Sequence, residues 1–118
     1  MEINLEEYLE PGVRVLSGST HGYMFRQRLQ LDRIDRTPGM GVVIRIPETI
    51  YSITDSFVMG LFERSIEYLG GERFRRKYMF EGRDDVVRRL EASVDLAVRH
   101  IENTVQQRNQ RRMMIRGR

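Results

Sequence analysis

Hydroxyl side chains gather in two short segments, and these hold most of the residues that could carry chemistry. One segment combines Ser17, Ser19 and Thr20 with His21, and the other runs through residues 52–56 as Ser-Ile-Thr-Asp-Ser. A histidine can activate a neighbouring hydroxyl, but a nucleophilic site also needs an orienting carboxylate and oxyanion donors. No spacing in the sequence supplies those groups. The hydroxyls are therefore expected to cap helices, or to meet a binding partner, rather than to attack a substrate.

Paired carboxylates and closely spaced glycines suggest two other kinds of site, but neither has the context that its chemistry requires. Asp32 and Asp35, like Asp84 and Asp85, are expected at helix ends and on solvent-facing positions, where carboxylates need no catalytic role. The glycines of residues 39–41 precede an apolar run, lack a third glycine and open no helix, so they do not form a dinucleotide-binding motif.

The composition narrows the function classes further. The 118 residues include no Cys and only two His, which excludes disulfides, thiol nucleophiles and Cys-ligated zinc. We expect no metal, no cofactor and no enzymatic activity. No apolar run approaches the roughly 18 residues of a membrane-spanning helix, and the acidic start does not resemble a signal peptide. These features predict a cytoplasmic protein that does not enter a membrane.

Charge is distributed unevenly along the chain. Residues 1–70 carry seven basic and ten acidic side chains, whereas residues 71–118 carry thirteen basic and seven acidic ones. Residues 106–118 contain five arginines and no acid. The length predicts one domain, which we place at residues 1–105, followed by a basic C-terminal tail at 106–118.

An Arg-rich half of this kind supports an alternative function, binding to the phosphates of a nucleic acid. The side chains that would carry it are Arg75, Arg76, Lys77, Arg108, Arg111, Arg112, Arg116 and Arg118. No aromatic residue is interleaved in the tail and no recognition-helix motif is evident, so a solvated terminal extension explains the same residues.

Hydrophobic periodicity predicts alternating strands and helices. Short strands are expected around Ile3 and over residues 13–16, and a longer interior strand over 41–46. Helices are expected over 21–34, with an N-cap from Ser17, Ser19 or Thr20, and over 55–69, with Asp55 as a candidate N-cap. A strand over 77–80 and a final helix from Asp84 or Asp85 to about residue 105 complete the pattern. This alternation indicates an α/β domain, with about four strands in a mixed sheet and three main helices.

The segment of residues 42–58, VVIRIPETIYSITDSFV, resembles the strand, turn and helix start of the STAS-like domain family, which is akin to bacterial anti-sigma factor antagonists. Ser17 and Gly18, followed by Met24-Phe25-Arg26, resemble the start of that family's first helix. Leu69 and Gly70, followed by Phe74, resemble the Leu-Gly-x-x-x-Phe connection of that family. The resemblance covers roughly residues 13–100 and implies a STAS-like fold.

The resemblance also implies a function. Ser56 matches the position of the phosphorylated serine of anti-sigma factor antagonists, and the implied partner is a serine kinase of the GHKL-ATPase-like class or an anti-sigma-like regulator. The chain departs from the family by having Thr54-Asp55-Ser56 in place of successive serines, and Met59 and Gly60 in place of acidic residues.

We therefore predict a non-enzymatic regulatory module that binds a protein partner through residues 52–62. The predicted partner-binding residues are Ser52, Thr54, Asp55, Ser56, Met59 and Gly60, with Ser56 as the candidate phosphoacceptor. Simple helix capping by the same hydroxyls remains an alternative. The apolar stripe of the final helix permits a homodimer and equally permits packing within one chain.

Overall fold

The structure is a computed structural model that describes the backbone of residues 1–116 and the side chains of residues 1–109. Strands and helices alternate along the described chain, which confirms the α/β class. The elements are β1 (Glu2–Asn4), a 3-10 helix η1 (Leu5–Tyr8), β2 (Val15–Leu16), α1 (Ser19–Leu29), α2 (Leu31–Asp35), β3 (Val42–Arg45), β4 (Ser52–Ile53), α3 (Asp55–Leu69), α4 (Gly71–Lys77), β5 (Tyr78–Glu81) and α5 (Asp84–Arg116).

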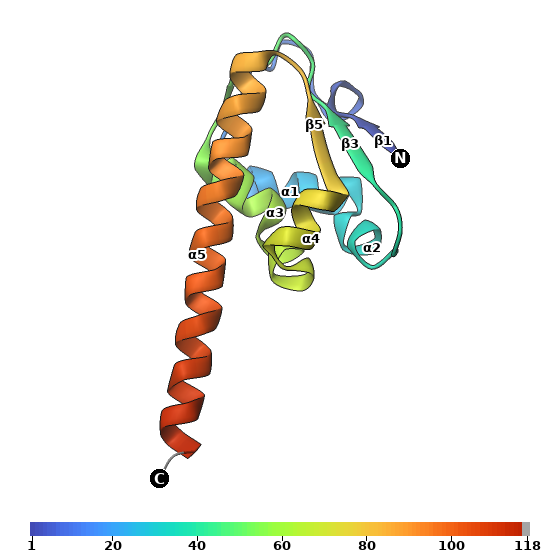
Figure 1. Ribbon diagram of the computed structural model, residues 1–118. Coiled ribbons are helices and arrows are strands. Elements are labelled where there is room, and N and C mark those ends of the chain that lie inside the picture. The colour runs from blue at the N-terminus through green and yellow to red at the C-terminus, as the bar shows by residue number, and fades with distance from the viewer. Residues whose placement is uncertain (117–118) are drawn as a thin grey trace.

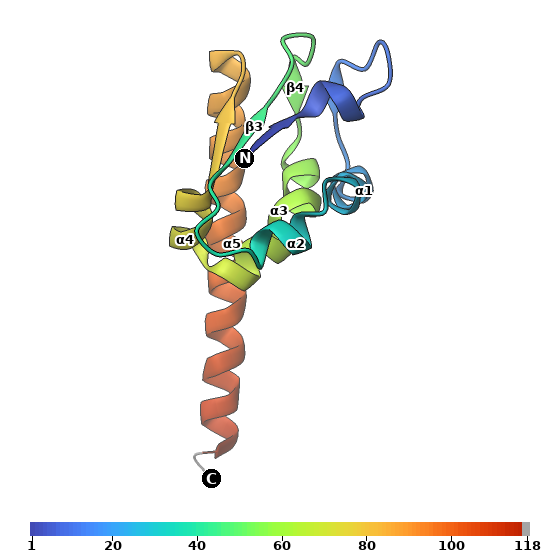
Figure 2. The same cartoon turned by 90° about the vertical axis from the view of Figure 1, so that its right-hand side faces the viewer.

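The described strands form two small sheets instead of the single mixed sheet that the sequence predicts. One sheet has the order β1-β3-β5 and the other pairs β2 with β4, and every pair within a sheet is parallel. Ile44 lies opposite Ile3 on one side and Phe80 on the other, so apolar side chains line up across the larger sheet. After β3 the chain turns back sharply and enters β4, as Figure 2 shows.

Helix α3 lies at the centre of the packing, between α1 and α5 (Figure 1). The sequence predicts its bounds correctly, because apolar residues recur along it at helical spacing and Gly70 ends it with φ 80°. Seven of its fifteen residues are buried, and their side chains fill the space between the sheets and the other helices. These residues are Phe57, Val58, Leu61, Phe62, Ser65, Ile66 and Leu69.

The helices over residues 19–35 and 71–77 differ from the sequence-based expectation. The predicted helix over 21–34 begins earlier, at Ser19, and is divided into α1 and α2 by Gln30, which adopts a left-handed φ of 56°. The amide of Gln30 donates to the carbonyl oxygens of Arg26 and Gln27, which closes α1 although no glycine marks the break. Residues 71–77 form α4. This helix was not predicted, because apolar residues alternate from Phe74 to Phe80 and this pattern is typical of a strand.

Two glycines allow α1 and α3 to cross with their backbones in contact. A Cβ atom added to Gly22 would lie 2.1 Å from the carbonyl oxygen of Phe57, and one added to Gly60 would lie 2.1 Å from that of Ser19. Real Cβ atoms do not approach backbone oxygens so closely. The crossing therefore requires glycine at both positions, and it fixes the start of α1 beside the start of α3.

A buried polar network holds the other side of the same helices. Arg26 of α1 donates to the carboxylate of Asp35 at 2.9 Å and to the hydroxyl of Ser65 at 2.7 Å. Ser65 and the hydroxyl of Tyr78 also donate to Asp35. Asp35 is only 5% exposed, so the prediction that it faces solvent was wrong. A buried carboxylate is tolerated here because an arginine and two hydroxyls surround it.

Helix α5 uses its apolar stripe to pack against the body and then continues beyond it (Figure 1). The buried side chains of the stripe end at Ile101, and Val105, one turn later, is 42% exposed. The backbone stays helical through Arg116, so it passes residue 105 without a break. No helix in the described part of the chain has the length and apolar character to cross a membrane.

The close crossing of α1 and α3 at Gly22 and Gly60 predicts that alanine destabilises the protein more at Gly22 than at a glycine outside the crossing. Gly22→Ala should lower the free energy of unfolding by about 3 kcal/mol, because the new methyl group must push two backbones apart. Gly41→Ala is the matched control, since nothing lies within 4 Å of a Cβ at that position, and its effect should stay within about 0.5 kcal/mol. Urea denaturation of both variants measures the difference, and equal effects would contradict the crossing.

The network predicts an alkaline loss of stability. Burial, together with the neighbouring Asp35 carboxylate, raises the pKa of Tyr78 far above its usual value. The folded protein keeps Tyr78 neutral, whereas Tyr78 of the unfolded chain ionises above about pH 10. The contribution of Tyr78 to stability is therefore constant below that pH and is lost above it. Tyr78→Phe should cost about 1–3 kcal/mol at pH 7 and flatten the alkaline decline. Urea unfolding between neutral and alkaline pH tests this, and an unchanged pH profile in the variant would argue against it.

Candidate partner-docking site

The two hydroxyl-rich segments meet at one place in the fold. Helix α1 follows β2, helix α3 follows β4, and these two strands are parallel neighbours whose carboxyl ends lie together. The amide of Thr54 donates to the carbonyl oxygen of Leu16 at 2.9 Å, which ties the two strand ends to each other. The starts of both helices therefore share a surface. The sequence alone does not show this proximity, because it depends on the pairing of β2 with β4.

Thr54 is the residue that caps α3. Its hydroxyl accepts hydrogen bonds from the amides of Phe57 and Gly18, each at 3.3 Å. The prediction that Asp55 is the N-cap was wrong, because Asp55 already belongs to the first helical turn. One threonine oxygen thus closes the start of α3 and also holds the residue that precedes α1.

Ser56 lies in the first turn of α3 and is exposed. Its hydroxyl lies 3.1 Å from that of Thr54, and either oxygen can donate. The first turn of a helix presents unpaired amide groups and the positive end of the helix dipole, which favours negative charge. A phosphate on Ser56 is therefore compatible with a folded α3.

Asp55 connects this turn to α5. Its carboxylate accepts a hydrogen bond from the hydroxyl of Ser93, a residue that is 2% exposed. The sequence gives no sign of Ser93, since a serine inside an apolar helical stripe resembles any small core residue. The contact means that the charge beside Ser56 has a fixed partner.

The other predicted partner-binding residues differ in their access to solvent. Ser52 is half-buried in β4, and Met59 is half-buried against the core. Gly60 faces the backbone of Ser19 in the helix crossing. The exposed part of the predicted site is therefore centred on Asp55 and Ser56.

The start of α1 lacks a side-chain cap. Gly18 occupies the N-cap position with φ 87°, so the predicted caps by Ser17, Ser19 or Thr20 are absent from this described segment. His21 is exposed, and its Nδ1 lies 3.2 Å from the carbonyl oxygen of Ser17. The first turn of α1 also has no acidic residue. The positive end of α1 thus lies beside the hydroxyls of α3 without a compensating charge of its own.

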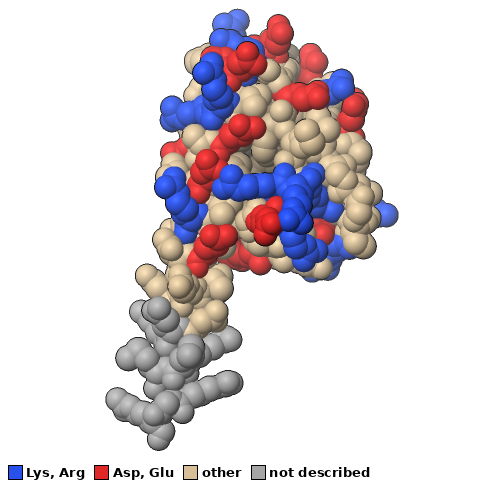
Figure 3. Space-filling view, viewed as in Figure 1, with Lys and Arg blue, Asp and Glu red and all other residues tan. Residues whose placement is uncertain are grey.

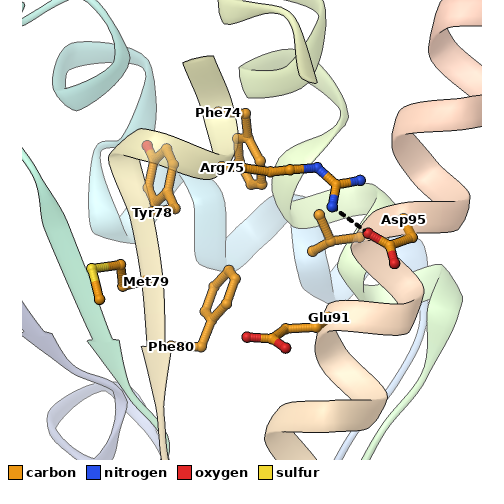
Figure 4. A pocket seen from close by; sticks show the side chains of 8 residues that line it. Phe74, Arg75, Tyr78, Met79, Phe80, Glu91 and Asp95 are labelled. Carbon is orange, nitrogen blue, oxygen red and sulfur yellow. Dashed lines mark ion pairs between the residues drawn. The ribbon is translucent and has the colours of Figure 1, made fainter. Parts of the chain in front are cut away.

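The basic residues of the alternative site differ in their contacts among the described side chains, and only Arg76 and Lys77 line the same pocket. Arg75 reaches from α4 to Asp95 on α5, with 2.6 Å between the charged atoms, across a cavity of about 390 Å³ (Figure 4). Arg76 pairs with Glu72, and Lys77 donates to the carbonyl oxygen of Thr37. Arg108 is exposed on α5. The side chains of Arg111, Arg112, Arg116 and Arg118 lie outside the described residues.

Capping and partner binding can be separated by mutation. Thr54→Ala should lower the free energy of unfolding by about 1 kcal/mol, because two amides lose their acceptor. Ser56→Ala should change it by less than about 0.5 kcal/mol, since Ser56 is exposed and caps neither helix. Thermal unfolding measured on both variants provides the test. A larger cost at Ser56 than at Thr54 would reverse the assignment of the cap.

Comparisons with protein-family models, curated proteins and solved structures found no match to this chain. Among the described residues, no group of three or more potential metal ligands lies together. The fold brings the starts of α1 and α3 together, with the exposed hydroxyl of Ser56 beside them.

Proposed function

We propose that the protein is a non-enzymatic regulatory module that binds a protein partner at the start of α3. The observation that carries this proposal is the exposed hydroxyl of Ser56 in the first turn of that helix. We define the docking surface as Thr54, Asp55 and Ser56, together with Ser19 and Thr20 from the adjoining start of α1.

A rigid base under this surface supports a role in docking. The glycine crossing of α1 and α3, the hydrogen bonds to Thr54 and the contact between Asp55 and Ser93 hold the surrounding backbone in place. An interface formed on such a base loses little conformational entropy when a partner binds. The exposed hydroxyl of Ser56 can then be modified without a rearrangement of the surface around it.

Phosphorylation of Ser56 would change the charge of this surface without unfolding it. A phosphoserine carries nearly two negative charges at pH 7, and the amide groups at the starts of both helices favour such a charge. A partner with an acidic or apolar contact surface would then be repelled or would bury the phosphate at a cost. The proposed regulation is therefore release of a partner upon phosphorylation.

The partner class rests on the resemblance to the STAS-like family. We propose a serine kinase of the GHKL-ATPase-like class, or an anti-sigma-like regulator, as the bound protein. A kinase that binds its own substrate serine gives a simple cycle, because the product of the reaction is the form that the kinase binds weakly.

Affinity purification from native cells, followed by mass spectrometry, tests the proposal with three forms of the protein. The unmodified chain and Ser56→Ala should retain the same ATP-binding partner, and Ser56→Glu should bind it about tenfold more weakly. Phosphate should be found on Ser56 in the unmodified chain. Ser56→Glu should also raise thermal stability slightly, by about 0.3–1 kcal/mol, because it places negative charge at a helix start.

Ser17→Ala is the matched control, because it removes an exposed hydroxyl from the loop before α1 and leaves α3 unchanged. Its partner set should equal that of the unmodified chain. Equal partner affinity for Ser56→Glu and the unmodified chain, with both variants folded, would overturn the proposed role of Ser56.

A further inference from the structure

A second surface, at the amino ends of β3 and β5, gathers basic side chains around a glycine-containing loop. A cavity of about 360 Å³ opens between α4 and the loop that leads into β3. We call it the α4 pocket, and the residues that the argument uses are Gly39, Met40 and Gly41 of the loop and Arg73, Arg76 and Lys77 of α4. Figure 3 shows Lys and Arg side chains gathered over the region of α4, with acidic side chains between them.

The three cations of the α4 pocket retain capacity for a ligand. Arg73 is exposed and has no carboxylate within ion-pair distance among the described residues. Among the described side chains, Arg76 pairs only with Glu72, and both side chains of that pair are more than 70% exposed, so the pair is weak and readily exchanged. Lys77 donates to the carbonyl oxygen of Thr37 at 2.7 Å, which holds its ammonium at the pocket and leaves it two further donors.

The acidic residue at the base of the pocket does not oppose an anion. Asp35 lines the cavity, but its charge is paired from within the core with Arg26, which also pairs with Asp32. Its two oxygens already accept hydrogen bonds from Arg26, Ser65 and Tyr78. Consequently the pocket presents an excess of positive charge to solvent.

The loop adds neutral donors to these charges. Among the described hydrogen bonds, none uses the amide of Gly39 or Gly41 as its donor. Gly39 has φ 76°, a conformation that brings successive amides to one side of a loop in many anion sites. We infer that the α4 pocket binds the phosphate group of a small phosphorylated molecule or free phosphate, through Arg73, Arg76, Lys77 and the amides of this loop.

Basic residues at the end of a helix also complement the helix dipole, and that role alone predicts no saturable site. The arrangement favours a ligand because Arg73 and Arg76 lie on the pocket while Arg75, on the same helix, turns to Asp95 on α5. Arginine suits a phosphate group because its planar fork can donate two parallel hydrogen bonds to it.

Nuclear magnetic resonance titration of the full chain tests the inference. Inorganic phosphate, added at constant ionic strength against sodium chloride, should produce saturable shifts of the Gly39 and Gly41 amide signals. Arg73→Ala should weaken the apparent affinity about tenfold, since it removes a charge-assisted hydrogen bond. Arg75→Ala removes the same charge from the other side of the helix and should leave the affinity within about twofold.

Glycerol 3-phosphate provides the second arm. Tighter binding than inorganic phosphate would identify a phosphorylated small molecule as the natural ligand, and equal or weaker binding would identify free phosphate. Shifts that do not saturate, or an equal loss of affinity in Arg73→Ala and Arg75→Ala, would overturn the site. Binding of an oligonucleotide that phosphate fails to displace would also overturn it, in favour of a nucleic acid. None of these measurements involves the partner proposed for Ser56, so the two proposals fail independently.

Discussion

The close crossing of α1 and α3 is the constraint on which the rest of the molecule depends. Gly22 and Gly60 bring the two backbones into contact, and no side chain could replace either hydrogen without moving a carbonyl oxygen. The starts of both helices then lie side by side. There Thr54 caps α3 and also accepts a hydrogen bond from the amide of Gly18, which precedes α1. On the other side of the crossing, Arg26 can reach from α1 to Ser65 on α3. Packing, capping and the buried network thus follow from one short interhelical distance.

The sequence predicts the elements whose signals are local. Helix α3 and strands β3 and β5 appear close to their expected positions, because periodic apolar residues and glycine or proline stops define them. Strand β4 was missed because residues 50–53 do not alternate between apolar and polar side chains. Helix α4 was missed because an alternating pattern begins within it. The break at Gln30 depends on a left-handed backbone conformation, and glutamine is not a residue type that indicates one.

Residues of the candidate site divide in the same way. The sequence predicts that Ser56 lies in the first turn of a periodic helix, which is a local signal, and the structure places it there. Thr54 rather than Asp55 caps the helix, and a choice between adjacent capping residues depends on backbone geometry that composition does not encode. Ser93 contacts Asp55, and Asp35 contacts Ser65, across more than 25 positions in the chain. Long-range partners of this kind require coordinates.

Helix α3 also connects the two proposed surfaces, since Ser56 lies in its first turn and Leu69 lines the α4 pocket from its last. A ligand at one end can influence the other only if it binds two arrangements of the intervening structure with different affinity. The α3 core offers a poor candidate for a second arrangement, because glycine contacts fix one face and a buried ion network fixes the other. A rigid helix under both surfaces therefore favours independent binding, with partner affinity unchanged when phosphate occupies the α4 pocket. Coupling between them would require the Arg26 and Asp35 network to open, at the cost of exposing or unpairing a buried charge.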